Sequence, residues 1–60
     1  MKIYYIEFRL GCFLHKGKSE QAALKYAKEQ YGLAHGPYYI RLATKEDIGH
    51  VEAMGGYIPE

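Results

Sequence analysis

Four side chains in this sequence have the chemistry of a metal ligand, Cys12, His15, His35 and His50. Thiolate and imidazole groups bind zinc in a tetrahedral shell at about 2.0–2.3 Å. Cys12 and His15 lie three positions apart, however, and residues at this spacing on a strand point to opposite faces. The other two histidines are single and distant in the chain. The pattern therefore predicts no metal site and no cofactor, and it indicates a half-buried thiol with three surface histidines.

Cys12 is also the candidate nucleophile. A cysteine acts as a nucleophile when its thiol pKa is depressed and when a base and a substrate cleft lie beside it. A chain of sixty residues in two layers leaves little room for a pocket of about 300 Å³ or more. The GxGxxG, P-loop, GxSxG and HExxH motifs do not occur in the sequence. We therefore expect a protein that is not an enzyme, and a small enzyme centred on Cys12 is the least favoured alternative.

Tyrosine and arginine form the second set of side chains with a distinctive chemistry. Seven of the sixty residues are tyrosine and none is tryptophan. The sequence contains a near-repeat, YYIEF at 4–8 and YYIRL at 38–42. Alternation of this kind is typical of a half-buried strand, and two such strands side by side would share one outward face. The residues that we expect to bind a partner on that face are Tyr5, Arg9, Tyr39 and Arg41.

A hairpin of two strands is predicted at the start of the chain. Residues 2–10 alternate, and one side carries Tyr4, Ile6, Phe8 and Leu10. Gly11 interrupts the alternation, and a second short strand over 12–16 follows, with either Phe13 and His15 or Cys12 and Leu14 on the outward face. A single long bent strand is the alternative, because the turn lacks an Asn-Gly pair.

Two helices and a third strand follow. Ser19 is a suitable N-cap for a helix over 20–31, and Gly32 is a suitable stop. The stripe that this helix turns toward the sheet consists of Ala23, Leu24, Ala27 and Tyr31. The third strand is expected over 38–43.

A short helix is predicted over 45–54. Thr44 and Asp47 before and within its first turn have the spacing of a capping box. Ile48, Val51 and Met54 line one side of the helix. The tail over 57–59 is expected to fold back.

These elements predict a single α+β domain over 1–60 in the order ββαβα. Short connections and right-handed crossovers restrict the layout. The third strand then pairs antiparallel with the first, which gives a three-stranded antiparallel sheet of order 2-1-3. In this two-layer arrangement the main helix covers one face and the short helix lies at an edge. Glu7 and Arg41 are expected to be cross-strand partners.

Composition and charge disfavour several classes of protein. The formal net charge is only +1, whereas most nucleic-acid binders carry a clearly basic patch. No apolar run approaches the roughly 18 residues of a membrane span, and the first residues lack the apolar core of a signal peptide. One cysteine forms no internal disulfide, so we expect a cytoplasmic protein. A domain of this size is marginal alone, which favours a homodimer or a partner-bound protein.

The functional prediction rests on the sheet face that has no helix. Tyr and Arg are enriched at hot spots of protein interfaces, so we expect a non-catalytic protein-interaction module that binds through this face or through an edge strand. Single-stranded nucleic acid is the alternative, because bases stack on exposed rings, although Glu7 and the low net charge disfavour it. A third interpretation assigns no function, because tyrosine is a good strand former.

Two segments supply most of the caps and core positions after residue 12. They are ATKEDI at 43–48, with Val51 and MGG at 54–56, and SEQAALKYA at 19–27. Together they resemble short uncharacterised proteins of bacteria and their phages or prophages. The resemblance implies no activity and no functional residues. It implies a small accessory or inhibitor protein that acts by binding a larger host or phage protein.

Overall fold

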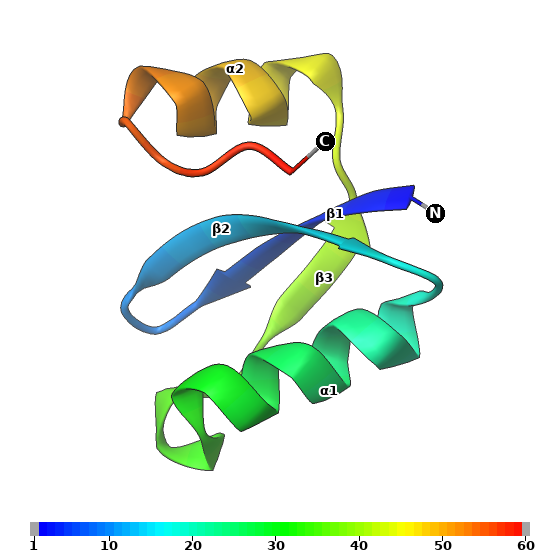
Figure 1. The fold of residues 1–60 in the computed structure, drawn as a ribbon. Helices are drawn as coiled ribbons and strands as arrows, with labels where there is room; N and C mark the ends of the chain where they lie inside the picture. The colour runs from blue at the N-terminus through cyan, green and yellow to red at the C-terminus, as the bar shows by residue number, and fades with distance from the viewer. Residues whose placement is uncertain (1, 60) are drawn as a thin grey trace.

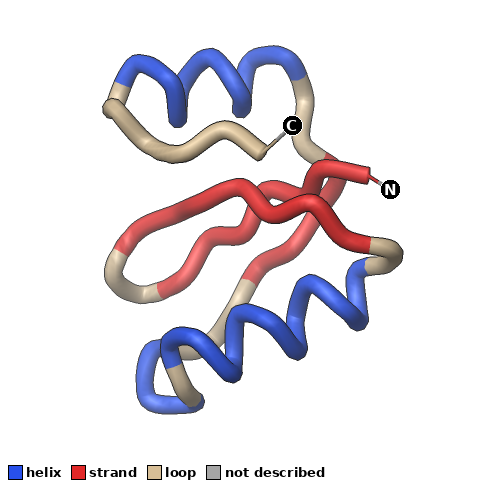
Figure 2. Tube along the Cα trace, viewed as in Figure 1, coloured by secondary structure: helices blue, strands red, loops and turns tan. Residues whose placement is uncertain are grey.

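A three-stranded antiparallel sheet lies between two helices in the computed structural model, which describes residues 2–59 (Figures 1 and 2). The elements in chain order are β1 (Lys2–Phe8), β2 (Gly11–Gly17), α1 (Glu20–Tyr31), the 3₁₀ helix η1 (Leu33–His35), β3 (Tyr39–Leu42) and α2 (Lys45–Ala53). The strand order is β2-β1-β3, and β1 is antiparallel to both neighbours. The predicted α+β class, sheet and strand order are confirmed. None of the described helices is long and apolar enough to cross a membrane.

The hairpin confirms a separate second strand but has its turn at a different place. Phe8 pairs with Gly11, so Arg9 and Leu10 form the connection. Gly11 opens β2 with a φ of +154°, which glycine adopts without steric cost. The expectation that Leu10 lies on the core side is wrong: the strand has already ended, and Leu10 is 69% exposed. The Arg9 N–H donates to the carbonyl of His35 (3.1 Å), which holds the turn against η1.

The main core lies between the sheet and α1. Tyr4 and Ile6 of β1 and Ala23 and Ala27 of α1 are buried in one cluster. Alanine side chains are small enough to let the helix axis lie close to the sheet, as interior packing at crystal-like density requires. The predicted helical stripe therefore packs against the sheet, as expected.

The ends of α1 also match the sequence expectation. The Ala22 N–H donates to the Ser19 side-chain oxygen (3.2 Å). Gly32 closes the helix with a φ of +79°, and its N–H donates to the carbonyl of Lys28 (2.8 Å).

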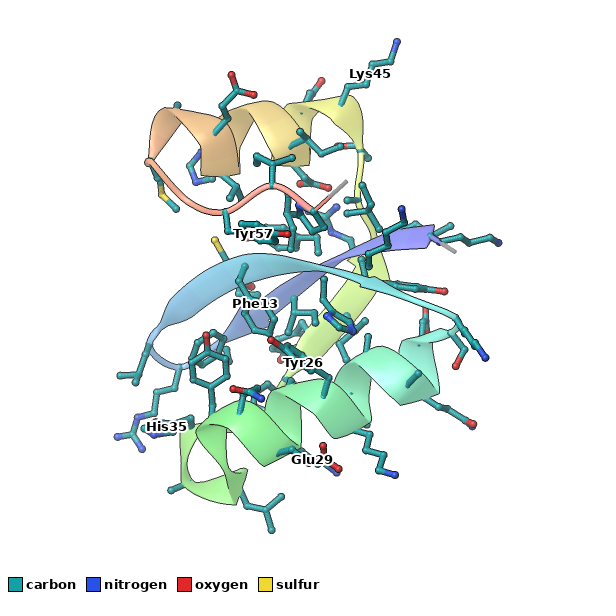
Figure 3. The ribbon with its side chains drawn as sticks, viewed as in Figure 1. Phe13, Tyr26, Glu29, His35, Lys45 and Tyr57 are labelled. Atoms are coloured by element: carbon teal, nitrogen blue, oxygen red, sulfur yellow. The ribbon has the colours of Figure 1, made fainter. Side chains whose placement is uncertain are left out.

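Aromatic rings fill the space around this core. Phe8 and Phe13 meet edge-on with ring centres 5.7 Å apart, and Tyr31 packs on both at 4.5 and 5.3 Å. Phe13 and Tyr26 lie between β2 and α1 (Figure 3), with ring centres 6.1 Å apart. His15 stacks on Tyr26 at 4.0 Å. Of the two pairs left open in β2, Phe13 and His15 therefore face α1.

The other face of the sheet is partly covered by α2. Strand pairing assigns to this face Tyr5, Glu7, Cys12, Leu14, Tyr39 and Arg41. The α2 helix lies on this side, over the edge strand β2, where Leu14 and Val51 are both buried (Figure 1). The sequence predicts this helix at an edge of the sheet, and it lies over the edge strand β2 on the face away from α1. The returning tail runs between α2 and β2 (Figure 1), and Val51 and Leu14 line one hollow together with Gly56 of that tail. The part of this face over β1 and β3 stays more open.

The tail after α2 folds back as expected. It runs from the end of the helix toward its start (Figure 1), and Pro59 is buried. The Gly56 N–H donates to the carbonyl of Val51 (2.9 Å), which starts this return.

Candidate interaction surface

The two Tyr-Tyr pairs each place one ring on either side of the sheet. Tyr4 is buried in the core and Tyr38 packs against it. Neighbouring residues on a strand alternate between faces, so Tyr5 and Tyr39 point away from α1. Tyr39 is 67% exposed, whereas Tyr5 is half-buried. One of the two rings expected on this face is thus fully available for contact.

An open hollow of about 710 Å³ lies at the hairpin end of this face. Its wall brings together three of the four predicted binding residues, Tyr5, Arg9 and Tyr39. Leu10 of the hairpin turn and His50 of α2 also line it. We call the surface around these five residues the hairpin hollow. Glu7 and Cys12 also line it, so apolar, phenolic, cationic and anionic groups meet on one concave surface.

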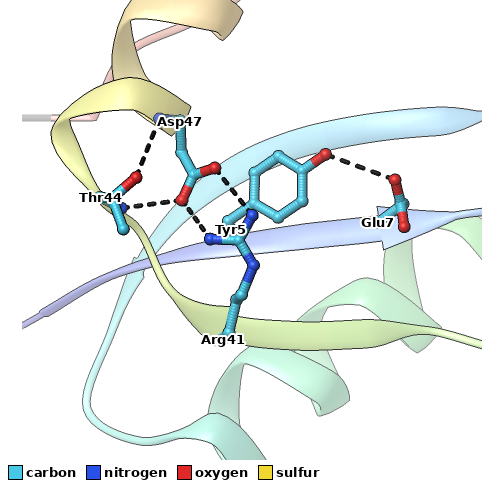
Figure 4. Close-up of polar contacts among 5 residues, drawn as sticks. All are labelled: Tyr5, Glu7, Arg41, Thr44 and Asp47. Atoms are coloured by element: carbon cyan, nitrogen blue, oxygen red, sulfur yellow. Dashed lines mark hydrogen bonds and ion pairs between the residues drawn. The ribbon is translucent and has the colours of Figure 1, made fainter.

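Arg41, the fourth predicted residue, does not line the hairpin hollow and is engaged within the chain. Its guanidinium forms two hydrogen bonds with the Asp47 carboxylate, the longer spanning 2.8 Å from Nη2 to Oδ1 (Figure 4). The same guanidinium lies 4.5 Å from the centre of the Tyr5 ring. The expected pair with Glu7 is wrong, because the register places Arg41 opposite Tyr5 and Glu7 opposite Tyr39. Arg41 links β3 to the start of α2.

Asp47 completes the predicted capping box at the start of α2. The Thr44 N–H donates to Asp47 Oδ2 (2.8 Å), and the Asp47 N–H donates to Thr44 Oγ1 (3.2 Å) (Figure 4). Hydrogen bonds from the Arg41 guanidinium and from the Thr44 N–H hold the pKa of Asp47 well below its usual range. The carboxylate is therefore charged at neutral pH, and it interacts favourably with the positive end of the helix dipole.

Tyr5 sits between the open and the covered parts of this face. A hydrogen bond with Cys12 raises the pKa of the Tyr5 phenol to about 12, with further contributions from burial and from electrostatic interaction with Cys12 and Glu7. The nearby Arg41 opposes the shift, but its effect is smaller. The phenol of Tyr5 also donates a long hydrogen bond to Glu7 Oε1 (3.5 Å). Tyr5 is thus a neutral hydrogen-bond donor in the wall of the hairpin hollow.

The four candidate metal ligands are dispersed. Cys12 and His50 line the hairpin hollow, His15 faces α1, and His35 belongs to η1. No three His, Cys, Asp or Glu side chains between residues 2 and 59 gather as a metal site would require. The group that interacts with the Cys12 thiol is the Tyr5 phenol, which is not a base at neutral pH.

Sequence reasoning missed two residues of this surface. His50 reaches it only because α2 docks over the sheet, which no local pattern reveals. Leu10 lies in the two-residue connection that precedes Gly11, and the glycine that interrupts the alternation is the sequence signal for that turn.

No protein-family model, curated protein or solved structure matches this chain.

Proposed function

We propose that this chain is a small, non-catalytic interaction module that binds another protein through the hairpin hollow. The observation that supports the proposal is the meeting of Arg9, Leu10 and Tyr39 on one concave surface outside the core. About two-thirds of Leu10 and of Tyr39 is exposed to water. A folded monomer gains no stability from such exposure, whereas Tyr and Arg are the residues that dominate interface energetics.

The groups in the hairpin hollow define the kind of partner segment that fits. Arg9 supplies a planar set of donors suited to a carboxylate. Tyr39 and Leu10 supply apolar area, whereas the O–H of Tyr5 is already engaged within the chain. We expect a projecting loop of the partner with an apolar side chain next to an acidic one. An accessory or inhibitor protein that acts on a larger protein would use a surface of this kind.

Photo-crosslinking in extract of the source cell tests this proposal. A photo-reactive amino acid replaces Leu10 in the hairpin hollow or, as a matched control, Tyr57, which is 78% exposed and lies elsewhere. We expect a protein adduct of constant mass from position 10 and none from position 57. An adduct that nuclease removes would instead indicate single-stranded nucleic acid. Equal adducts from both positions, or none from either, would contradict the proposal.

The captured protein, once purified, allows the contact to be quantified. Arg9→Ala is expected to weaken binding roughly tenfold, the effect of losing about 1.4 kcal/mol at a hot spot. Lys45→Ala removes a similar charge from the start of α2, where the side chain projects away from the sheet (Figure 3), and should leave affinity unchanged. Equal affinities of the two variants would exclude Arg9 from the interface.

A further inference from the structure

The outer edge of β3 presents backbone groups without partners. The Ala43 N–H donates to the carbonyl of Ile3 (2.9 Å), in the register in which β1 pairs with β3. Residues that bond to a neighbouring strand alternate along an antiparallel ladder. The N–H and C=O groups of Ile40 and Leu42 consequently point away from β1. Within residues 2–59, no hydrogen bond from another element reaches them.

We infer that this edge pairs with β3 of a second copy of the chain, antiparallel, about a twofold axis beside Ile40. The two three-stranded sheets then form one continuous antiparallel sheet. Ile40 exchanges backbone hydrogen bonds with its counterpart, and Leu42 lies opposite Tyr38 of the second copy. This inference goes beyond the proposed function, because it concerns the strand edge. Tyr39 is the residue that the edge contact shares with the hairpin hollow.

The pairing joins complementary side chains on the face away from α1. Tyr39 lies opposite Arg41 of the second copy, at a position without backbone hydrogen bonds where side chains approach closely. A guanidinium is attracted to the face of a tyrosine ring, and Arg41 already lies over the ring of Tyr5 in its own chain. The twofold axis makes the contact occur twice.

The pairing also covers apolar side chains on the α1 face. Leu42 is 50% exposed although it points to the side of the sheet that holds the core. In the pair it lies beside Tyr38 of the second copy, where an open hollow of about 400 Å³ is lined by Leu24, Leu33 and Tyr38. Leu33 is itself 77% exposed. Each chain thus offers a protruding leucine and, at the matching place, an apolar hollow.

A shift of the axis to Arg41 gives a poorer match. It would place each Arg41 directly opposite its counterpart, and like charges in that position are destabilising. The axis beside Ile40 avoids this repulsion. Because such an axis is perpendicular to the sheet, the two hairpin hollows of the pair open on the same side.

Sedimentation equilibrium of the purified protein over a rising concentration series tests the inference. The mass should rise from 6.9 kDa to twice that value. Leu42→Lys puts a charge on the β3 edge of each copy. It is expected to weaken the dimer roughly tenfold or more, because both copies carry the substitution at the interface. Met54→Lys adds the same charge at a residue 58% exposed at the end of α2 and should leave the dimer unchanged. Circular dichroism confirms that both variants are folded.

Charge substitutions at position 39 test the register. Tyr39→Glu places a carboxylate opposite Arg41 of the second copy and should tighten the dimer, whereas Tyr39→Arg should weaken it. The two variants should differ roughly tenfold in dissociation constant at low salt. In its own chain Tyr39 lies opposite Glu7, so the same substitutions change folding stability in the opposite sense, which separates the two effects.

Three outcomes would overturn the inference. They are a mass that stays at the monomer value at every concentration, equal dissociation of Leu42→Lys and Met54→Lys, and a tighter dimer from Tyr39→Arg than from Tyr39→Glu.

Discussion

The Gly49→Ala variant tests whether α2 is formed in the folded protein. Gly49 lies inside α2 on its exposed side, and an added Cβ would have no neighbour within 4 Å beyond the helix's own backbone. Glycine in a helix interior is less favourable than alanine by about 0.8–1.0 kcal/mol. For sixty residues, the entropy of unfolding is about 0.13 kcal/mol/K, so the melting temperature should rise by about 7 °C.

The matched variant Gly56→Ala should act in the opposite direction. An added Cβ there would lie 2.7 Å from Val51 Cγ1 and 3.2 Å from the Val51 carbonyl oxygen. Valine is stiff at χ1 and the carbonyl belongs to α2, so the contact cannot relax easily. Overpacking of this kind costs about 1–3 kcal/mol, or roughly 10 °C or more in a domain of this size.

Thermal unfolding followed by circular dichroism at one fixed concentration measures both variants. A fixed concentration matters because any dimer makes the melting temperature depend on it. A rise below about 2 °C for Gly49→Ala would show that residues 45–53 are not helical in the folded state. That result would also remove His50 from the wall of the hairpin hollow.

Three further predictions concern the contacts that hold α2 and Tyr5. Thr44→Ala removes the hydroxyl that accepts a hydrogen bond from the Asp47 N–H. It should cost about 1 kcal/mol and lower the melting temperature by about 8 °C, whereas Thr44→Ser should change it little. Equal melting temperatures of the two variants would contradict the cap. The lowered pKa of Asp47 makes its contribution to stability complete above about pH 4 and lost as the pH falls through that value toward the lowered pKa. Wild-type protein should therefore lose more stability in acid than Asp47→Asn, and parallel losses would refute the ion pair. The Tyr5 pKa, raised from about 10 to about 12, makes its contribution complete below about pH 10 and lost as the pH rises toward 12. Tyrosinate absorbance should show one late-titrating group that Tyr5→Phe abolishes, and its persistence in that variant would assign the shift elsewhere.

Local signals predicted most of the fold. The Ser19 cap, the Gly32 stop and the Thr44–Asp47 box depend on residues only a few positions apart, so their spacing was sufficient evidence. Strand alternation likewise assigned Tyr4 and Tyr38 to the core side and Tyr5 and Tyr39 to the other. Alternation says nothing of where a strand ends, which is why Leu10 was misplaced in the core.

The candidate surface was predictable only in part. Tyr5, Arg9 and Tyr39 share a face through strand geometry, and the structure brings them to one hollow. The roles of Arg41 and His50 depend on where α2 docks. That position follows from the burial of Val51 and Leu14, which are far apart in the sequence and line one hollow, and from the Arg41 contact with Asp47. No pattern within one element contains this information.

The central claim is that the hairpin hollow binds the partner. The most direct test is to add the captured protein to the isotope-labelled chain and to follow the amide chemical shifts. We predict changes concentrated at Arg9, Leu10, Tyr39 and His50. The outward face of α1, around Glu29 (Figure 3), should remain unchanged. Changes concentrated around Glu29 and absent from the hairpin hollow would contradict the account.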